Sequence, residues 1–337
     1  MRIKKIIYVG YKYELSSKGK KLYAHNYNAW YKTFIELGYE TESVFYDDFN
    51  EKTLILELSK RVKEFSPDLL FFVLSKDQFS IEDLEFIKKL NVTTLNFFGD
   101  DNFRYDNYSK YRSKYFDWCV TTDKFSYLKY KAANDTKVIL SQWASFFFQE
   151  LNTDIKYRYA VSFVGGYSPY RKWFIDQLKQ KFQIDVSCYG NGWPNGPVGY
   201  EDIQKIISLS KINLNIPNSY SYDYRYNLNS IKNFIKIFLP KHKNASQIKA
   251  RNFEIPSSNG FQLTNYVPFL EDYFELGKEV VCYSNLEEAA LLINYYLNNE
   301  KIRKNILKNS YNNVILNHTF KNRIKDIITE VEKFYVK

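Results

Sequence analysis

Short apolar runs alternate with amphipathic helical patterns along this chain of 337 residues, and this alternation constrains the fold more than any other feature. Most of the apolar runs end at or near a glycine or an aspartate, as buried parallel strands commonly do. The segments between them repeat apolar residues at the helical period. Strand–helix–strand units of this kind form parallel sheets with helices on both faces. The sequence therefore predicts an α/β protein.

The alternation runs to about residue 150 and then restarts, so we predict two Rossmann-like, doubly wound domains over residues 1–152 and 153–318, followed by a helix over 319–337. The predicted strands of the first domain are 3–9, 41–46, 69–74, 93–98, 118–121 and 138–140, its helices are 26–37, 54–65, 82–90 and 127–132, and its polar segment Lys12–Lys21 is a loop. The predicted strands of the second domain are 160–164, 185–189, 212–216, 260–264 and 280–283, and its helices are 171–181, 201–208, 286–297 and 301–313.

An insertion over residues 218–244 interrupts the second domain. It opens with the polar and aromatic run SYSYDYRYN, and it continues as a predicted surface helix with an apolar face and several lysines. The apolar face consists of Ile231, Phe234, Ile235 and Phe238, and the lysines are Lys232, Lys236, Lys241 and Lys243. Such a helix either contacts a membrane or acceptor or packs on its own domain, so peripheral membrane contact through 229–243 is one of two open interpretations.

Charge and cysteine usage limit the partners and the compartment. The net charge of +10 favours a nucleotide, a nucleic acid or an anionic membrane surface as partner. Three widely spaced cysteines and three scattered histidines, without CxxC spacing, fit a reducing cytosol and predict no zinc site. The first residues lack the apolar core of a signal peptide, and no run is long enough to span a membrane. We therefore expect a cytoplasmic protein without a metal or cofactor.

The stretch Ser246–Thr264 combines two cations with a carboxylate. Lys249 and Arg251 are suited to bind an anion, because arginine can hold a phosphate with two parallel hydrogen bonds. Glu254 follows Arg251 within one helical turn, so the two side chains can face the same cleft, where a carboxylate accepts from sugar hydroxyls. An exposed Arg–Glu pair on an ordinary helix has the same spacing and stays open as an alternative.

Several residues fall at the carboxyl ends of predicted strands, where open α/β sheets bind ligands. Gly165 and Gly166 would let the backbone approach a pyrophosphate, and Arg171 with Lys172 begins the next helix, where cations indicate a nearby anion or a solvated pair. Gly190 opens another loop, in which Trp193 could stack on a base or a sugar.

Three residues of the first domain are candidate catalytic groups. Asp100 and Asp101 follow a predicted strand, where an aspartate serves as a general base or as a helix N-cap. His25 precedes the first long helix and could face the cleft between the domains, although a single histidine is more often structural.

Four sequence segments together resemble the CgeB-like bacterial glycosyltransferases, a branch similar to the large retaining glycosyltransferase family of GT-B fold. The segments are VSFVGGYSPYRKWFIDQL, DVSCYGNGWPNGPVGYEDIQKIISLSKINLNI, QIKARNFEIPSSNGFQLTN and YFELGKEVVCYSNLEEAALLINYYLNNEKIRKNI, between about residues 160 and 320. In the first domain FFGDD and TTDKFSYLKY fit the same family more loosely.

The resemblance implies two Rossmann-like domains that face a central cleft, with a C-terminal helix that crosses back to the first domain. It implies a nucleotide-diphosphate sugar, UDP- or GDP-linked, as donor and a glycan, a lipid-linked molecule or a protein as acceptor, with no metal. Arg171 matches the basic residue after the first glycine loop, and Glu254 matches the glutamate that binds the donor ribose. Ser246 stands where the paired-glutamate motif of the family has its first glutamate, so the contact to the donor sugar and the stereochemistry stay open.

The leading hypothesis is a metal-independent glycosyltransferase, of the hexosyltransferase type, that builds a bacterial surface polysaccharide or modifies an envelope component. A basic nucleic-acid-binding protein is an alternative, but such a protein should carry one continuous basic stripe, and here the cations are spread over both domains. A catalytically inactive relative that acts as a scaffold is a third possibility, which the serine at position 246 keeps open.

Overall fold

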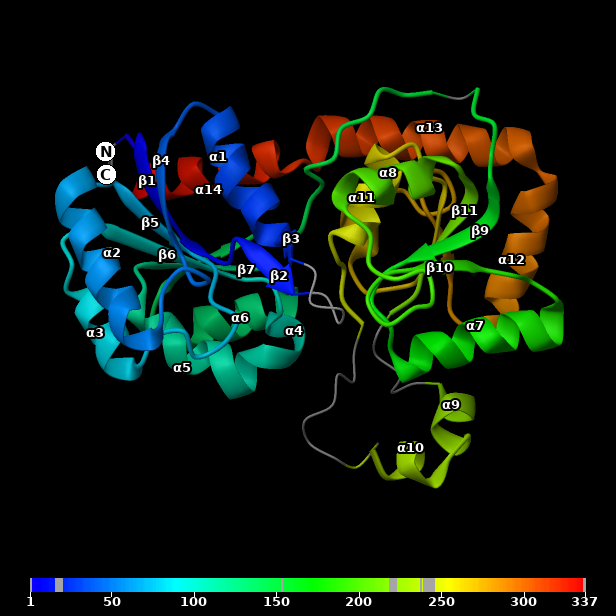
Figure 1. Ribbon diagram of the computed structural model, residues 1–337, viewed down its shortest axis with the longest axis horizontal. Coiled ribbons are helices and arrows are strands. Elements are labelled where there is room, and N and C mark those ends of the chain that lie inside the picture. The colour runs from blue at the N-terminus through cyan, green and yellow to red at the C-terminus, as the bar shows by residue number, and fades with distance from the viewer. Residues whose placement is uncertain are drawn as a thin grey trace. The chain divides into compact units, whose positions relative to one another are not determined.

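The computed structural model describes residues 2–15, 21–152, 154–217, 223–236, 238 and 246–335. The chain forms two compact units (Figure 1). Unit 1 consists of Met1–Phe146 and Phe320–Lys337, and unit 2 consists of Phe147–Thr319. The C-terminal helix therefore belongs to the same unit as the N-terminal strand, although more than half of the sequence separates them.

Unit 1 contains a parallel sheet with the strand order β4-β1-β5-β6-β7-β8. Its strands are β1 (Lys5–Gly10), β4 (Glu40–Phe45), β5 (Leu69–Phe72), β6 (Thr93–Phe98), β7 (Trp118–Thr121) and β8 (Lys137–Leu140). The chain moves from β1 outward to β4 and then returns to the other side of β1 to form β5, so the direction of winding reverses between β1 and β5. The predicted doubly wound α/β fold is confirmed for this unit.

Two separate apolar clusters cover the two faces of this sheet. Alternate side chains of β1 point to opposite faces, so Ile6 and Tyr8 lie in one cluster and Ile7 and Val9 in the other. The helices of unit 1 are α1 (Thr33–Glu36), which continues a π-helical turn at Tyr27–Lys32, α2 (Glu51–Phe65), α3 (Ile81–Lys88), α4 (Asp101–Arg104), α5 (Lys110–Arg112), α6 (Lys124–Ala133) and α14 (Phe320–Tyr335).

The C-terminal helix α14 completes one of these clusters. Its residues Phe320, Ile324 and Ile327 are at most 1% exposed, and the Phe320 ring lies 5.0 Å from the ring of Trp30. Figure 1 shows α14, in red, beside α1, in blue. The predicted return of the C-terminal helix to the first domain is confirmed.

The predicted loop Lys12–Lys21 is wrong in part, because its ends form an antiparallel hairpin. Strands β2 (Tyr13–Leu15) and β3 (Lys21–Tyr23) pair in register, and the opposed rings of Tyr13 and Tyr23 stack with their centroids 5.3 Å apart. Cross-strand ring contacts stabilise such a pair despite the surrounding lysines. Residues 16–20 lie outside the described part of the chain.

Unit 2 repeats the same plan with the strand order β10-β9-β11-β12-β13, again all parallel. Its strands are β9 (Tyr159–Val164), β10 (Ser187–Tyr189), β11 (Ser210–Asn215), β12 (Gln262–Asn265) and β13 (Val281–Tyr283). Its helices are α7 (Pro169–Phe182), α8 (Tyr200–Ser208), α9 (Tyr224–Leu228), α10 (Ile231–Lys236), α11 (Arg251–Ser257), α12 (Leu286–Asn298) and α13 (Glu300–Asn317). The winding reverses between β9 and β11, because β10 lies on the other side of β9.

The two faces of the unit 2 sheet differ in polarity. On one face, strand residues such as Phe163 and Leu214 pack with Phe174 of α7 and Ile293 of α12. On the other face the strands carry buried polar side chains at the same register: the Ser162 hydroxyl donates to Asn213 Oδ1 over 3.1 Å, and Asn213 Nδ2 donates to the carbonyl of Ile207 over 3.1 Å. Because these polar groups satisfy one another, they are accommodated in the interior.

The insertion forms two short helices in the part that the structure describes. Helix α9 lies near its start, and α10 contains the predicted apolar residues Ile231, Phe234 and Ile235, which confirms a helix over Ile231–Lys236. Lys241 and Lys243 lie outside the described residues.

Candidate functional site

A cavity of about 260 Å³ lies in unit 2 where the direction of winding reverses, at the carboxyl ends of β9 and β11. This position is the usual ligand site of an open, doubly wound sheet, because the loops that follow the two strands diverge there and leave a crevice. The residues that line it are Phe163, Val164, Gly165, Gly166, Arg171, Asn215, Ile216, Pro217, Ser246, Gln247, Lys249, Arg251, Asn252 and Asn265.

The loop Gly165–Gly166 forms one wall, and a later glycine, Gly190, allows it to lie there. Gly190 has a φ of +130°, and a Cβ atom on it would lie 2.2 Å from the carbonyl oxygen of Gly165. Gly165 N–H donates to the carbonyl of Tyr189 over 2.9 Å, so the two loops are hydrogen-bonded at this point. A Cβ on Gly166, in contrast, would meet nothing within 4 Å. Gly190 thus shapes the wall, whereas Gly166 leaves open space beside its backbone.

Trp193 supports the same loop from inside the unit. It is 6% exposed, its indole N–H donates to the Gly165 carbonyl over 2.9 Å, and its ring packs edge-on against Phe163 and Tyr167. The ring lies in the apolar cluster of unit 2 and does not line the cavity. The structure therefore places Trp193 behind the wall and not in a position to stack on a ligand in this cavity.

Arg171 is hydrogen-bonded to the segments that follow β9 and β11. Its Nε donates to the carbonyl of Ile216 over 2.9 Å and its Nη1 to the carbonyl of Gly166 over 2.8 Å, so one side chain ties the ends of β9 and β11 together. Burial, and secondly the positive charge of Arg251, lower the pKa of Arg171 to about 10. An anion in the cavity would relieve this repulsion between two guanidinium groups.

Lys172, the neighbour of Arg171, is directed elsewhere. Its ammonium group forms a 2.5 Å ion pair with Asp176 one turn further along α7, and both side chains are partly exposed. Of the two cations that the sequence places at this helix start, only Arg171 lines the cavity.

The stretch that precedes and begins α11 forms the opposite wall. Lys249 and Arg251 both line the cavity, as does Ser246, which stands at the position of the family's other glutamate. Asn252 fixes this turn, because its Oδ1 accepts from the Lys249 N–H over 3.0 Å and its Nδ2 donates to Thr264 Oγ1 over 3.4 Å. The two halves of the cavity, around residues 165 and 250, are thus brought together by the adjacent parallel strands β9, β11 and β12.

Glu254 lies one helical turn behind Arg251. The predicted spacing is confirmed: Glu254 Oε2 is 3.0 Å from Arg251 Nη1, and the Glu254 side chain is only 3% exposed. Glu254 does not itself line the cavity. Its carboxylate contacts Arg251, which does. A buried carboxylate of this kind fixes the direction of a guanidinium group.

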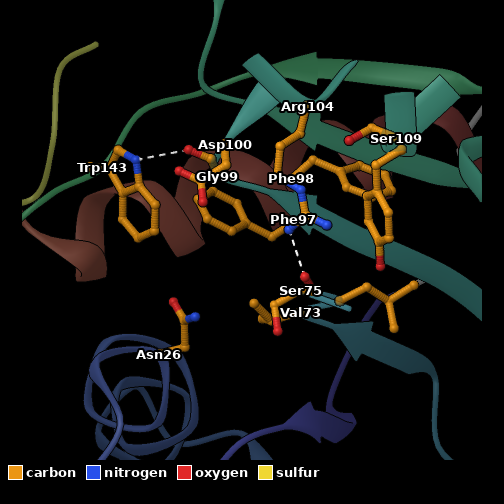
Figure 2. A pocket seen from close by; sticks show the side chains of 12 residues that line it. Asn26, Val73, Ser75, Phe97, Phe98, Gly99, Asp100, Arg104, Ser109 and Trp143 are labelled. Carbon is orange, nitrogen blue, oxygen red and sulfur yellow. Dashed lines mark hydrogen bonds between the residues drawn. The ribbon is translucent and has the colours of Figure 1, made fainter. Parts of the chain in front are cut away.

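Unit 1 has a smaller pocket, of about 70 Å³, at the carboxyl ends of β5 and β6 (Figure 2). Trp143 and Asn26 lie on one side of it, and Arg104 lies on the other. The Trp143 indole N–H donates to the Gly99 carbonyl over 3.2 Å, and Arg104 Nη1 donates to the Ser75 carbonyl over 2.6 Å. These bonds hold an aromatic and a cationic side chain at the pocket wall.

The two candidate aspartates of unit 1 have different positions. Asp100 lines the pocket and precedes α4, although its side chain does not cap that helix. Asp101 is 1% exposed and accepts from the Tyr130 hydroxyl over 3.1 Å, away from the pocket. Burial raises the pKa of Asp101 to about 7, and hydrogen bonds from Ser109 and Thr121 partly oppose that rise. Asp101 is therefore placed as a buried structural group, and Asp100 is the aspartate that a ligand can reach.

His25 is placed beside this pocket but not in its wall. Its ring packs edge-on against Trp143 and Phe146, with centroid distances of 5.5 Å and 5.2 Å. The ring thereby supports Trp143, which is a wall residue.

Sequence reasoning missed several residues of both pockets. Asn215, Ile216 and Pro217 directly follow a predicted strand, so the rule that ligands bind at strand ends could have identified them. Arg104, Tyr108 and Trp143 reach the unit 1 pocket from segments that carry no comparable signal in the sequence.

Two general searches complete the description of the sites. Within the described ranges, no group of three or more His, Cys, Asp or Glu side chains is arranged to hold a metal ion. In the same part of the chain, no helix combines the length and the apolar character needed to cross a membrane.

Comparison with protein families gives one match, which includes most of unit 2. Residues 171–329 match the Glycosyl transferase-like family. The matched segment includes Arg171, the whole of α11 and the first part of α14. The match agrees with the predicted glycosyltransferase and does not distinguish a CgeB-like branch. No curated protein matches the chain.

Comparison with solved structures identifies the fold. The Anabaena protein Alr3699/HepE in complex with UDP superposes with a TM-score of 0.59 at 10% identity, covering 97% of this chain and 100% of that chain. Its complex with UDP-glucose gives a TM-score of 0.59 at 10% identity, covering 98% and 99%. Sucrose-phosphate synthase from Thermosynechococcus elongatus gives 0.60 at 9% identity, covering 98% of each chain. The chain thus has the GT-B fold of glycosyltransferases, as predicted.

The contrast between Gly190 and Gly166 yields a prediction. Gly190→Ala should lower the thermal stability of the protein, because alanine at a φ of +130° is strained and its Cβ would collide with Gly165 O. A strained backbone conformation of this kind costs about 1–3 kcal/mol. Thermal unfolding of both variants measures the effect, with Gly166→Ala as the matched control in the adjacent loop. Equal unfolding temperatures for Gly190→Ala and the wild type would contradict the described packing of the two loops.

Proposed function

We propose that this chain is a glycosyltransferase that binds a nucleotide-diphosphate sugar in the cavity of unit 2 and transfers the sugar to an acceptor. One observation carries the proposal. Three basic residues, Arg171, Lys249 and Arg251, line one cavity at the strand ends, beside the glycine loop. A site that concentrates positive charge beside a glycine loop is suited to a diphosphate.

Three contributions would hold the diphosphate. Arg251 supplies a guanidinium that Glu254 orients, Lys249 supplies a second cation from the same turn, and Arg171 supplies a third from the other wall. Glycine at position 166 lets the phosphate oxygens approach the backbone, since nothing occupies the space beside it. As the bond between sugar and diphosphate breaks, the negative charge on the diphosphate increases, so these cations would stabilise the transition state more than the bound donor.

UDP is the first nucleotide to test. Structures of similar fold contain UDP and UDP-glucose, at 10% sequence identity to this chain. The base and the sugar of the donor are therefore to be identified by experiment. Glu254, which the family resemblance pairs with the donor ribose, lies directly behind Arg251. We propose that it acts on the donor through Arg251 and through any ribose hydroxyl that reaches it.

The acceptor is proposed to use the unit 1 pocket. Asp100 would accept a proton from the attacking hydroxyl, and Trp143 offers an indole ring beside it, a common surface for a sugar ring. A glycan acceptor fits this pairing of an aromatic ring with a carboxylate. We propose a reducing, cytoplasmic location, which fits three free thiols of which two are buried.

The first experiment measures UDP affinity and sugar transfer or donor hydrolysis in the wild type, Arg251→Ala and Glu254→Gln. Each charge-assisted hydrogen bond is worth about 1.5–3 kcal/mol, so each variant should lose about ten- to a hundredfold in UDP affinity. Arg251→Ala should also lower kcat, because the charge that it stabilises grows during the reaction.

The partly buried pair Arg61–Glu57 is a matched control for this experiment. It is also an Arg–Glu pair on one helix, with a 2.7 Å contact, but it lies in unit 1 on α2. Arg61→Ala and Glu57→Gln should leave UDP affinity and turnover unchanged.

UDP binding without transfer in the wild type would favour an inactive scaffold, and binding of DNA without UDP would favour the nucleic-acid alternative.

The second experiment compares the two aspartates of unit 1. Asp100→Asn should lower kcat by at least about a hundredfold, the typical contribution of a general base, with UDP affinity unchanged. Asp101→Asn should instead affect stability. Because the pKa of Asp101 is raised to about 7 in the folded state, this carboxyl group ionises first in the unfolded state. The free energy of unfolding therefore falls as pH rises from about 4 to about 7, and the variant should lack this loss. Normal turnover of Asp100→Asn would exclude it as the base.

A further inference from the structure

The two helices of the insertion expose more large apolar side chains than a short segment of a water-facing surface normally does. Among the described residues, six such side chains lie between positions 224 and 238. They are Tyr224 at 70% exposed, Leu228 at 66%, Ile231 at 81%, Phe234 at 44%, Ile235 at 54% and Phe238 at 73%. A contiguous apolar patch on a monomer commonly marks an interaction surface.

The first of these helices is firmly attached to unit 2. Tyr226 is 2% exposed, and its ring packs on those of Tyr170 and Trp173 at 5.3 Å and 5.6 Å. Arg225 forms ion pairs with Asp223 and with Glu287 on α12. Tyr226 thus faces inward while its neighbours two positions away, Tyr224 and Leu228, face outward. The exposed side chains are therefore held on a fixed base.

The second helix is linked to the first by a hydrogen bond across the short connection. Asn233 Nδ2 donates to the Tyr226 carbonyl over 3.3 Å, and the rings of Phe234 and Phe238 pack edge-on at 5.5 Å. We call the exposed apolar residues of α9 and α10, together with Phe238 just after α10, the apolar patch.

The sequence that carries the apolar patch contains no acidic residue after Asp223. Between Asp223 and Glu254 the sequence contains no Asp or Glu. Of its basic residues, Arg225 is paired with Asp223 and Glu287, and Lys249 and Arg251 line the cavity, which leaves Lys232, Lys236, Lys241 and Lys243 in the sequence of the insertion. Lys232 is exposed on α10 and makes no ion pair with any residue that the structure describes. Aromatic and branched apolar side chains combined with lysines are typical of helices that lie in the interface of an anionic bilayer.

We propose that the apolar patch docks unit 2 on an anionic lipid bilayer. The apolar side chains of α9 and α10 insert at the boundary of the headgroups and the acyl chains, and Lys232 contacts lipid phosphates. Neither helix is long enough to cross a bilayer, so the attachment is peripheral. The proposal concerns where the protein acts and does not depend on the proposed reaction.

The experiment uses the full chain and sedimentation with vesicles of phosphatidylcholine, with or without phosphatidylserine. The wild type should bind the vesicles that contain phosphatidylserine, and added salt should weaken the binding. Ile231→Ser with Ile235→Ser should lower the partition coefficient at least about tenfold, because two branched apolar side chains no longer insert. Lys232→Glu should lower it by about tenfold or more, since it replaces an attracted charge with a repelled one.

Two matched variants keep the test specific. Leu291 on α12 is 68% exposed and Lys301 on α13 is exposed, both in unit 2 outside the patch. Leu291→Ser and Lys301→Glu should bind vesicles like the wild type, and thermal unfolding should be unchanged in every variant. Equal vesicle binding by the wild type and the patch variants would overturn the proposal. A concentration-dependent dimer that the patch variants abolish, without vesicle binding, would also overturn it and identify the patch as an interface between two copies of the chain.

Discussion

The proposed site depends on one electrostatic constraint, the crowding of positive charge at the carboxyl ends of β9 and β11. Arg171 donates two hydrogen bonds, to the carbonyls of Ile216 and Gly166. These bonds hold its guanidinium group at the strand ends, although burial and the charge of Arg251 both disfavour its charged form. Arg251 in turn is held by the buried carboxylate of Glu254. Only one carboxylate thus faces these two guanidinium groups in the described contacts, and a diphosphate would supply the missing negative charge.

Sheet topology explains how such distant residues meet. Parallel strands end at the same edge of a sheet, and the reversal of winding between β9 and β11 opens a crevice at that edge. The loop after β9 contributes Gly165, and the first turn of α7 contributes Arg171. The stretch that precedes and begins α11 contributes Lys249 and Arg251 from about eighty residues later. Gly190, from a third loop, allows the first wall its position because any side chain there would meet Gly165 O. The same topology in unit 1 places Asp100 in a second, smaller pocket.

Much of the fold could be predicted from the sequence, because the spacing of apolar residues indicates which side chains are buried. The buried side chains of the strands and of α14 form the cores of the two units. The cations of the unit 2 site could also be predicted. Arg171 begins a predicted helix after a glycine loop, and Arg251 precedes Glu254 by one helical turn. The sequence did not predict the direction in which individual side chains point. Trp193 stands in a glycine-rich loop, but its indole turns inward to the Gly165 carbonyl, and Asp101 turns to Tyr130 while Asp100 faces the pocket. Spacing along the chain does not encode these choices, because they depend on partners from distant strands. The same limit applies to the hairpin of Tyr13 and Tyr23, which is stabilised by ring contacts across the pair.

Hydrogen exchange of the backbone amides, with and without UDP, tests the central claim most directly. If the cavity of unit 2 holds the diphosphate, UDP should slow exchange in the glycine loop and the first turn of α7, around Gly166 and Arg171, and in the turn from Gln247 to Asn252. Exchange in the strand-end loops of unit 1 around Asp100 should stay the same. Protection by UDP that is confined to unit 1, or the absence of protection at both walls of the unit 2 cavity under saturating UDP, would contradict the account.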